Sequence, residues 1–158
     1  MRSRRVHPRQ RSGFSLLELV LVVTIVGTFA AIAVPRYNNS LIRYRVDSAA
    51  QRIVNDFEYA RTQAMSRSRA QLVVFDLTAE AYVLPNVEGL SAQSESYRVK
   101  LGADPYRVDL ASASFGGSNA VTFDLFGKPS NSGTVVVQIG TTKRTISLSA
   151  TTGKASYS

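Results

Sequence analysis

The residues able to do chemistry are few, and their types exclude most kinds of catalytic site. The 158-residue sequence has no Cys and one His, His7, in an N-terminal stretch that we expect to be removed. A mature chain without these residues has no thiol nucleophile, no imidazole base, no disulfide and no zinc site of the usual ligand types. It also shows no glycine-rich phosphate loop, nucleotide fingerprint or paired-carboxylate motif. We therefore predict that the protein is not an enzyme and needs no cofactor.

Three aspartates in the second half of the sequence could suggest a calcium site. Asp104, Asp109 and Asp124 carry the oxygens that Ca²⁺ prefers, but their spacing does not fit a loop that surrounds the ion. Aspartates of this kind are more often found in turns and at strand edges. We therefore predict no bound metal.

One carboxylate lies in an unusual place. Glu18 is the single charged residue between Phe14 and Val34, a run that reads FSLLELVLVVTIVGTFAAIAV. About 20 helical residues cross the roughly 30 Å hydrocarbon core of a bilayer, so this run is long enough to span a membrane. An ionised carboxylate in hydrocarbon is costly unless it is paired. Glu18 is therefore either functional or close enough to the interface for its charge to reach the headgroups.

The flanks of this apolar run indicate its orientation. Five arginines and no acid precede it, in residues 1–13. Basic residues on one flank keep that end in the cytoplasm, which places the following chain outside. The run is then a secretory signal cleaved near Ala31-Ile32-Ala33, a plain signal anchor, or a signal of a third kind.

The third possibility depends on the residues that begin the run, Gly13-Phe14-Ser15-Leu16-Leu17-Glu18. A glycine, a hydrophobic residue, a glutamate four positions further on and an unbroken apolar run together resemble the type III signal of prepilins, the precursors of type IV pilin-like proteins. The resemblance implies that a membrane peptidase cleaves after Gly13 and methylates the new amine of Phe14. It also implies that Glu18 pairs with the N-terminal amine of a neighbouring subunit.

A helical stem follows the apolar run. Pro35 stands where a helix would kink or restart, because proline lacks an N–H and clashes with the preceding turn. Apolar residues then recur at helical spacing: Ile42, Val46, Ala49, Ile53, Phe57, Ala60 and Ala64. Polar residues, among them Arg52 and Asp56, occupy the other positions. The pattern predicts an amphipathic helix to about Arg69, and one bent helix from Phe14 would extend roughly 84 Å at 1.5 Å per residue.

From Ala70 onward the pattern changes to that of strands. The predicted strands are Gln71–Asp76, Ala81–Pro85, Tyr97–Leu101, Tyr106–Phe115, Ala120–Asp124, Thr134–Ile139, Arg144–Ser149 and Ala155–Tyr157. Turn sequences separate most of them, and the polar stretch 88–96 is predicted to be an exposed loop. Short strands with such turns indicate antiparallel pairing. We therefore predict an α+β, pilin-like fold, in which a long N-terminal helix with a transmembrane half and an amphipathic half packs on a small antiparallel β head.

Parts of the second half resemble the minor pseudopilin H and fimbrial-T group of pilin-like proteins. One part is the helix end at 56–64 followed by Gln71–Asp76. The others are Phe123-Asp124 with Gly127, and the segment 144–148 ahead of Thr152-Gly153-Lys154. The resemblance implies a small structural subunit of a filament.

The net charge of +8 does not by itself indicate nucleic-acid binding. The excess lies in residues 1–13 and 36–69, whereas residues 70–158 hold seven basic and seven acidic residues, so the head has no electrostatic footprint for DNA. Some proteins of the fimbrial-T group take up DNA through a C-terminal run of glycine, basic, any, basic. Here Gly153-Lys154-Ala155-Ser156 lacks the second basic residue. In that alternative the phosphate contacts would be Lys143, Arg144 and Lys154.

These patterns predict four parts: a basic leader at 1–13 that is removed, a transmembrane and filament-core helix at 14–34, an amphipathic stem at 35–69 and a β-rich head at 70–158. We predict a minor pilin or pseudopilin, a structural subunit of a type II secretion or type IV pilus-like filament. Its partners would be other pilins or pseudopilins and the prepilin peptidase. It would lie in the bacterial inner membrane with its N-terminus in the cytoplasm and its head outside, and then enter the filament. The alternative is a pilin that binds DNA or a surface; nucleic-acid binding is not expected.

Overall fold

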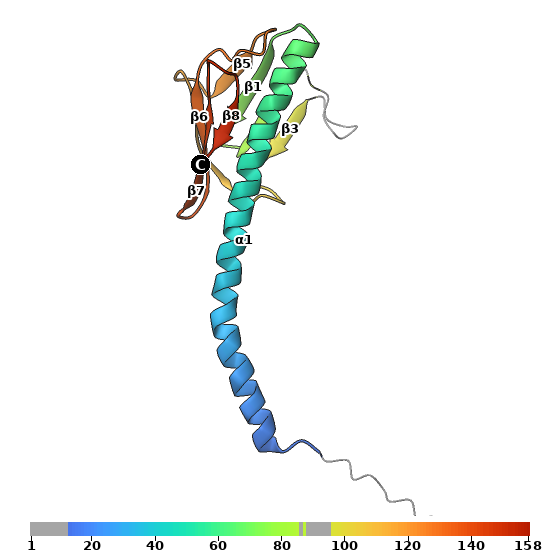
Figure 1. The fold of residues 1–158 in the computed structure, drawn as a ribbon, viewed down its shortest axis with the longest axis vertical. Coiled ribbons are helices and arrows are strands. Elements are labelled where there is room, and N and C mark those ends of the chain that lie inside the picture. Colours follow the sequence, from blue (N-terminus) through green and yellow to red (C-terminus); the bar gives the residue numbers. More distant parts are fainter. Residues whose placement is uncertain (1–12, 86, 88–95) are drawn as a thin grey trace, which may run out of the picture. The chain divides into compact units, whose positions relative to one another are not determined.

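The computed structural model describes residues 13–85, 87 and 96–158, in which one helix is followed by eight strands (Figure 1). The helix is α1 (Leu16–Ser66). The strands are β1 (Gln71–Asp76), β2 (Ala81–Leu84), β3 (Tyr97–Lys100), β4 (Asp109–Phe115), β5 (Ala120–Phe123), β6 (Gly133–Ile139), β7 (Thr142–Leu148) and β8 (Ala155–Tyr157). Residues 1–12 of the predicted leader and 88–95 of the predicted loop lie outside the described residues.

The helix α1 continues without interruption across Pro35. A kink at Pro35 and the four-part division of the chain stay predictions. The chain divides into two compact units, Met1–Asn39 and Ser40–Ser158. The first unit holds the beginning of α1, and the second holds the rest of α1 and all the described strands.

The end of α1 has a defined capping structure. The helix ends at Ser66, slightly before the predicted end at Arg69. The backbone N–H of Arg69 donates to the carbonyl of Ala64 (3.1 Å), and that of Ser68 donates to the carbonyl of Met65 (3.3 Å). With Ser68 in the left-handed region (φ 50°), these two bonds form the Schellman motif, which ends the helix and leads the chain into β1.

Two four-stranded sheets build the Ser40–Ser158 unit. One has the strand order β3-β2-β1-β5, and the other has the order β4-β6-β7-β8. Each of the six strand pairs is antiparallel, which confirms the predicted α+β fold with an antiparallel head. The tightest connection is the two-residue turn Gly140-Thr141 between β6 and β7, where Gly140 has a φ of 57°.

The strand boundaries follow the predicted ones closely except at the start of β4. This strand begins at Asp109 and not at Tyr106. The backbone N–H groups of Tyr106 and Arg107 both donate to the carbonyl of Ala103, at 3.1 and 2.9 Å. Arg107 has a φ of 50°, which is incompatible with an extended strand, so the chain is still in a turn at this point.

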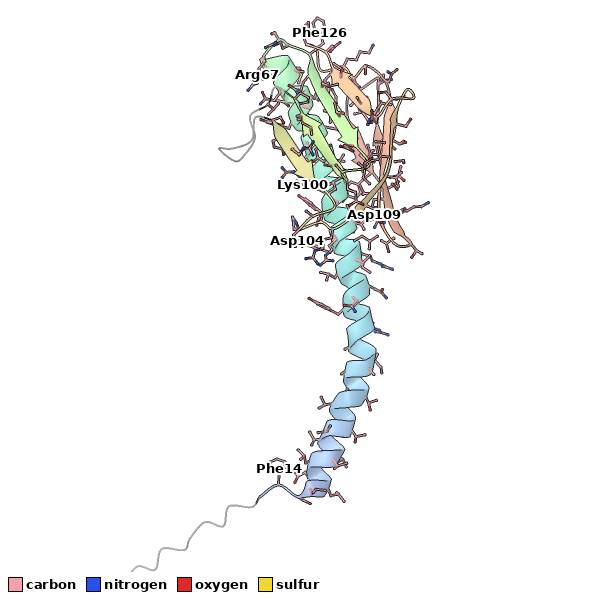
Figure 2. The ribbon with its side chains drawn as sticks, turned by 180° about the vertical axis from the view of Figure 1, so that it is seen from behind. Phe14, Arg67, Lys100, Asp104, Asp109 and Phe126 are labelled. Atoms are coloured by element: carbon pink, nitrogen blue, oxygen red, sulfur yellow. The ribbon has the colours of Figure 1, made fainter. Side chains whose placement is uncertain are left out.

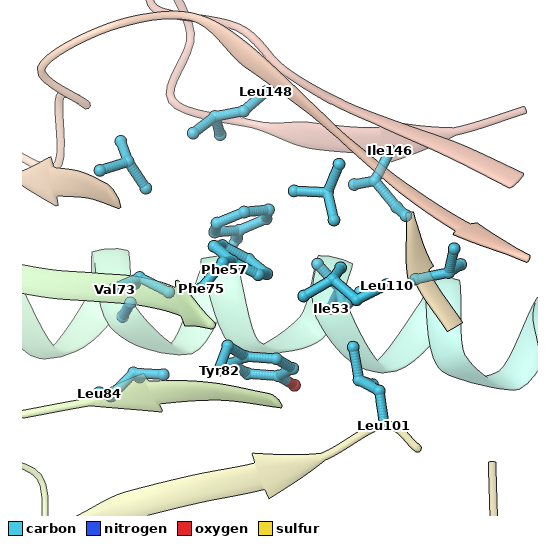
Figure 3. Close-up of a cluster of buried hydrophobic side chains, with 14 of the residues drawn as sticks. Ile53, Phe57, Val73, Phe75, Tyr82, Leu84, Leu101, Leu110, Ile146 and Leu148 are labelled. Atoms are coloured by element: carbon cyan, nitrogen blue, oxygen red, sulfur yellow. The ribbon is translucent and has the colours of Figure 1, made fainter. Parts of the chain in front are cut away.

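The predicted apolar stripe of α1 forms the centre of the core. Its residues are buried except Ile42, which is half-buried. The Phe57 ring lies 5.9 Å from the rings of both Phe75 in β1 and Phe115 in β4, centroid to centroid (Figure 3). One helical side chain therefore contacts both sheets in the tilted and edge-on geometries that aromatic pairs prefer.

The core is complete within the second unit. Its members all lie between Val46 and Leu148 in the sequence. Four helical alanines have almost no exposed surface, and their small side chains let the helix approach the sheets closely: Ala49, Ala50, Ala60 and Ala64. The Ser40–Ser158 unit therefore buries its apolar surface without a contribution from the N-terminal unit.

Candidate functional site

The start of α1 holds the residues of the predicted cleavage and methylation site. Gly13, Phe14 and Ser15 precede the helix and are exposed. The helix begins at Leu16, and the carbonyl of Ser15 accepts the N–H of Leu19 (3.1 Å). The peptide bond between Gly13 and Phe14 therefore lies in non-helical, accessible backbone. Glu18 is exposed in the first turn of the helix, where the helix dipole favours a negative charge.

The apolar run after Phe14 has no covering within its own unit. An 18-residue window of α1 has a mean hydropathy of 2.5, and none of it is buried in the protein. By length and composition this part of the helix can cross a membrane. Soluble proteins rarely expose so large a continuous apolar surface, so this segment needs lipid or other protein surfaces around it.

The two threonines in this run satisfy their own hydroxyl groups. The Thr24 hydroxyl donates to the carbonyl of Val20 (2.7 Å), and the Thr28 hydroxyl donates to the carbonyl of Thr24 (2.8 Å). Bonds to the carbonyl one turn earlier are how hydroxyl residues avoid unpaired polar groups in lipid. The helix surface between Leu16 and Ala33 therefore presents one charged group, the carboxylate of Glu18.

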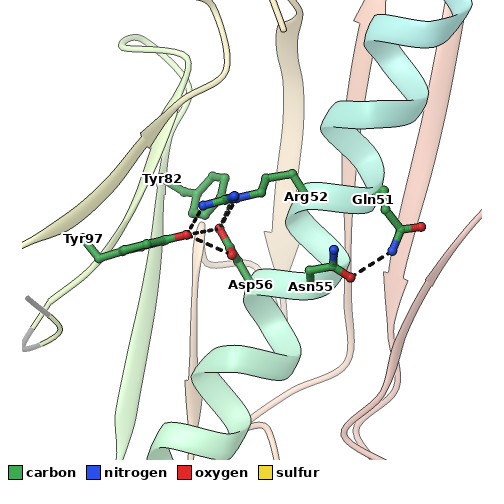
Figure 4. A network of polar contacts seen from close by, with 6 residues as sticks. All are labelled: Gln51, Arg52, Asn55, Asp56, Tyr82 and Tyr97. Atoms are coloured by element: carbon green, nitrogen blue, oxygen red, sulfur yellow. Dashed lines mark hydrogen bonds and ion pairs between the residues drawn. The ribbon is translucent and has the colours of Figure 1, made fainter. Parts of the chain in front are cut away.

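A second polar site lies inside the head, where Asp56 of α1 meets two tyrosines of the sheet (Figure 4). Its carboxylate accepts the hydroxyl of Tyr82 in β2 at 2.5 Å and the hydroxyl of Tyr97 in β3 at 3.0 Å. Arg52, one turn earlier on α1, donates to the same carboxylate at 3.1 Å and also donates to the Tyr97 hydroxyl. Beside this group, the amide of Gln51 donates to Asn55 (2.9 Å) on the outer surface of the helix.

The electrostatics of this cluster make it a structural clamp. Burial, reinforced by the neighbouring Asp56 charge, raises the pKa of Tyr82 well above its usual value and that of Tyr97 to about 12. Burial lowers the pKa of Arg52, but the Asp56 carboxylate and the two tyrosines together outweigh it and raise that pKa overall. Both hydroxyls and the guanidinium therefore stay protonated donors at neutral pH. Both hydroxyls and the guanidinium donate to the Asp56 carboxylate, and Arg52 also donates to the Tyr97 hydroxyl, so the cluster holds α1 on β2 and β3.

The sequence does not reveal this cluster. Arg52 and Asp56 occupy polar positions of the predicted helix, yet Asp56 is only 7% exposed. The available signal was the spacing of an arginine and an aspartate by one turn, next to the apolar stripe. That spacing is common on exposed helix surfaces, and the tyrosine partners lie 26 and 41 residues away.

Two glycines of the C-terminal motifs meet at the end of α1. Gly127 (φ 76°) and Gly153 (φ 67°) both have backbone conformations that favour glycine. A Cβ on Gly127 would lie 2.9 Å from the sulfur of Met65 and 3.0 Å from Cγ of Arg61. A Cβ on Gly153 would lie 2.6 Å from the carbonyl oxygen of Gly127. These glycines allow two turns to pack against each other and against the helix.

The three cations of the DNA-binding alternative are not brought together. Lys143 is exposed near the β6–β7 turn, and Arg144 forms an ion pair with Asp47 of α1 (2.7 Å). Lys154 is exposed just beyond the other end of β7, where its carbonyl accepts the N–H of Ser149 (3.0 Å). Ser149 comes six residues after Lys143 along β7, a distance of about 20 Å. A continuous phosphate-binding surface of these residues is therefore not favoured.

Two of the three aspartates considered for calcium have other partners. Asp104 forms an exposed ion pair with Arg107 (2.7 Å), and Oδ1 of Asp124 accepts the N–H groups of Phe126 and Lys128. Asp109 is an exposed residue at the start of β4. Within residues 13–85, 87 and 96–158, no three His, Cys, Asp or Glu side chains are grouped as metal ligands would be.

Comparison with known proteins gives two family matches. Residues 49–152 match the family of the type II transport protein GspH, and residues 8–34 match the prokaryotic N-terminal methylation motif. The chain is 50% identical over 36 residues to the type IV major fimbrial protein FimA of Dichelobacter nodosus, which is 23% of each chain. It is 29% identical over 86 residues to a fimbrial protein of the same organism. The chain thus spans about a quarter of the length of the first relative and about half of the second.

The fold is also similar to that of a solved structure. Two crystal forms of the type IV minor pilin FimU of Pseudomonas aeruginosa superpose with TM-scores of 0.53 and 0.51 at 20% and 19% identity. The superpositions cover 73% and 71% of this chain and 90% and 91% of the other. At this level of identity the similarity concerns the fold, a helix on antiparallel sheets.

Proposed function

Because the chain belongs to the family of the type II transport protein GspH, we propose that it is a minor pilin or pseudopilin, a structural subunit of a pilus-like filament. The observation that carries this proposal is the uncovered apolar helix behind a methylation motif. The core of the head is complete without this apolar segment. A soluble protein with such a head would therefore have little use for the segment. The role is one of assembly and not of catalysis.

Maturation is the first step of the proposed function. A membrane peptidase cleaves after Gly13 and methylates the new amine of Phe14, and the leader 1–13 is lost. The exposed, non-helical backbone from Gly13 to Ser15 supports this step, because a protease needs extended and accessible substrate. The conventional alternative, cleavage near Ala33, has less support because residues 31–33 lie within continuous helix.

Membrane insertion and assembly follow. The segment 14–34 anchors the chain in the inner membrane with its N-terminus on the cytoplasmic side, as the basic leader favours, and the head lies outside. On assembly these segments leave lipid and pack against the same segments of neighbouring pilins. Glu18 then pairs with the amine of Phe14 on a neighbour, which relieves the cost of a carboxylate in an apolar surrounding.

The alternative of a pilin that binds DNA is less favoured. Its three candidate contacts are spread over both ends of β7, and Arg144 is already held by Asp47. Type II secretion and type IV pili remain the two candidate filaments. The GspH match favours the former, and the fimbrial relatives favour the latter.

The proposal is tested by the N-terminal sequence and intact mass of the protein from its native membrane. We expect a chain that starts at Phe14 and carries one added methyl group. Gly13→Leu should keep the leader, whereas Gly27→Leu should be processed normally; neither glycine has an atom within 4 Å of an added Cβ, so packing does not distinguish them. A mature chain that starts at Val34 would show a conventional secreted protein and would contradict the filament role.

A further inference from the structure

The end of the head where α1 finishes carries an exposed apolar turn among cations. Leu125 and Phe126 follow β5, with 48% and 78% of their surfaces exposed. Phe126 is the most exposed large apolar side chain in the described part of the Ser40–Ser158 unit. Figure 2 shows it at the same end as Arg67, away from Lys100 and Asp104. The tip patch, as we call this surface, consists of Leu125, Phe126, Lys128, Lys154, Arg61 and Arg69.

The turn that presents Phe126 is held firmly by Asp124. Oδ1 of Asp124 accepts the N–H of Phe126 at 2.9 Å and that of Lys128 at 2.8 Å. Its backbone N–H donates to the carbonyl of Lys128, and its own carbonyl accepts the N–H of Gly127, both at 2.9 Å. Phe126 is therefore pre-positioned in solvent, and a partner that covers it orders little additional backbone.

The cations converge on this turn from three segments. Lys128 belongs to the turn itself, and Lys154 follows Gly153, whose added Cβ would lie 2.6 Å from the carbonyl of Gly127. Arg61 of α1 lies beside both glycines, because an added Cβ would lie 3.0 Å from its Cγ at Gly127 and 3.2 Å from its Nε at Gly153. Arg69 follows the helix cap, just before β1 pairs with β5 through Gln71 and Phe123.

The charge of the tip patch is positive although the head as a whole is neutral. Within four residues of these cations in the sequence, the acids are Glu58, which pairs with Arg61 at 3.0 Å, and Asp124, which binds its own turn. Lys128 and Lys154 are exposed beside the apolar apex. Summing the charge over the sequence hides this local excess, because acidic residues such as Asp104 and Asp109 lie away from this end of the head (Figure 2).

We propose that the tip patch docks on an anionic phospholipid surface. Leu125 and Phe126 would enter the boundary between headgroups and acyl chains, and the flanking cations would lie against the lipid phosphates. A nucleic acid would use the cations and stack on Phe126, but it would gain nothing from an exposed leucine at the apex. An adjacent aliphatic and aromatic pair ringed by lysine and arginine matches a surface that is apolar and anionic at once.

The first test uses the full chain in phosphatidylcholine nanodiscs, mixed with vesicles that contain phosphatidylglycerol or only phosphatidylcholine. We expect flotation with the phosphatidylglycerol vesicles, and loss of binding as salt is raised. Phe126→Ala should lower the partition coefficient about tenfold, and Lys128→Ala or Lys154→Ala about fivefold each. Leu77→Ala and Lys100→Ala are the matched controls, with an exposed leucine and a lysine at the opposite end of the head, and should bind as the unchanged chain does.

The second test uses the absence of Trp from the sequence. Phe126→Trp places one indole at the apex, and nanodiscs with the unchanged chain provide the blank. We expect its emission to shift to shorter wavelength with phosphatidylglycerol vesicles, while Leu77→Trp does not respond. Thermal unfolding confirms that each variant is folded. The proposal is overturned by an unchanged emission, by equal effects in the controls, or by a response to a single-stranded oligonucleotide or an acidic protein without one to the vesicles.

Discussion

Replacement of Asp56 by Ala tests whether the buried clamp holds the helix on the sheet. The change removes the carboxylate that accepts two tyrosine hydroxyls and the Arg52 guanidinium. Tyr82 and Tyr97 are 1% and 6% exposed, so water cannot easily replace the lost acceptor. Arg52 has about a third of its side chain exposed and can turn to solvent.

The expected loss follows from these exposures. A buried hydroxyl left without a partner costs about 1–3 kcal/mol, which applies fully to Tyr82 and less to Tyr97. Loss of the ion pair with Arg52 also lowers the free energy of unfolding, by a fraction of the several kcal/mol that breaking a fully buried pair would cost. The better helix propensity of alanine offsets about 0.5 kcal/mol of the total loss. We expect the free energy of unfolding to fall by about 3 kcal/mol, or roughly 10 °C in Tm for a unit of this size.

The assay is thermal unfolding of the detergent-solubilised full chain, monitored by the near-ultraviolet circular dichroism of its tyrosines. Asp47→Ala is the matched control, because this aspartate is also ion-paired on α1, to Arg144, but both side chains are about a third or more exposed. Its loss should stay below about 1 kcal/mol. The double variant Tyr82→Phe, Asp56→Ala should lose less free energy of unfolding than the sum of the losses of the two single variants, because both single changes remove the same hydrogen bond. Equal losses for Asp56→Ala and Asp47→Ala would refute the clamp.

Two further predictions concern the same unit. Burial, with the Asp56 charge, raises the pKa of Tyr97 from 10.0 to about 12, so the contribution of its neutral form to stability is complete below pH 10 and is lost as the pH rises through about 12. Between about pH 10 and 12 the free energy of unfolding should therefore fall less steeply with pH in Tyr97→Phe than in the unchanged chain. Tyr157→Phe, at an exposed tyrosine, is the control, and identical pH curves for Tyr97→Phe and the unchanged chain would contradict the prediction. Gly153→Ala combines a φ of 67° with a Cβ 2.6 Å from a carbonyl oxygen, whereas Gly140→Ala has a φ of 57° and open space. Urea unfolding should show a loss of about 3 kcal/mol for the former and about 1 kcal/mol for the latter, and equal losses would mean that packing at Gly153 is unimportant.

The regular elements of the head could be predicted because their signals are local. The stripe that includes Val46, Ile53 and Phe57 repeats with the period of a helix, and all its buried members line the core. Strand β1 was predicted with its correct bounds because a short run of Leu, Val and Phe lies between polar residues. In the structure its burial alternates, with Val73 and Phe75 buried. A period of two or of 3.6 residues needs only neighbours in the chain.

The clamp could not be predicted in the same way. Whether Asp56 is exposed depends on Tyr82 and Tyr97, which reach it only when β2 and β3 pair at the correct register. The strand order of both sheets is likewise a property of distant pairings. The convergence of Gly127 and Gly153 on Arg61 is a third example, since a glycine in the sequence does not reveal which backbone comes close to it.

The exposed surface of the N-terminal apolar segment bears on how a filament could form. No side chain described between Leu16 and Ala33 is buried, so this surface adds nothing to the stability of the head. Lipid tails are as apolar as leucine, so transfer of this surface from lipid to the segments of neighbouring subunits changes hydrophobic free energy little. We infer that the hydrophobic effect keeps the segment out of water but does not determine where it stops in a filament. That position must depend on groups whose free energy differs strongly between the two surroundings, and between Leu16 and Ala33 the charged group of this kind is Glu18.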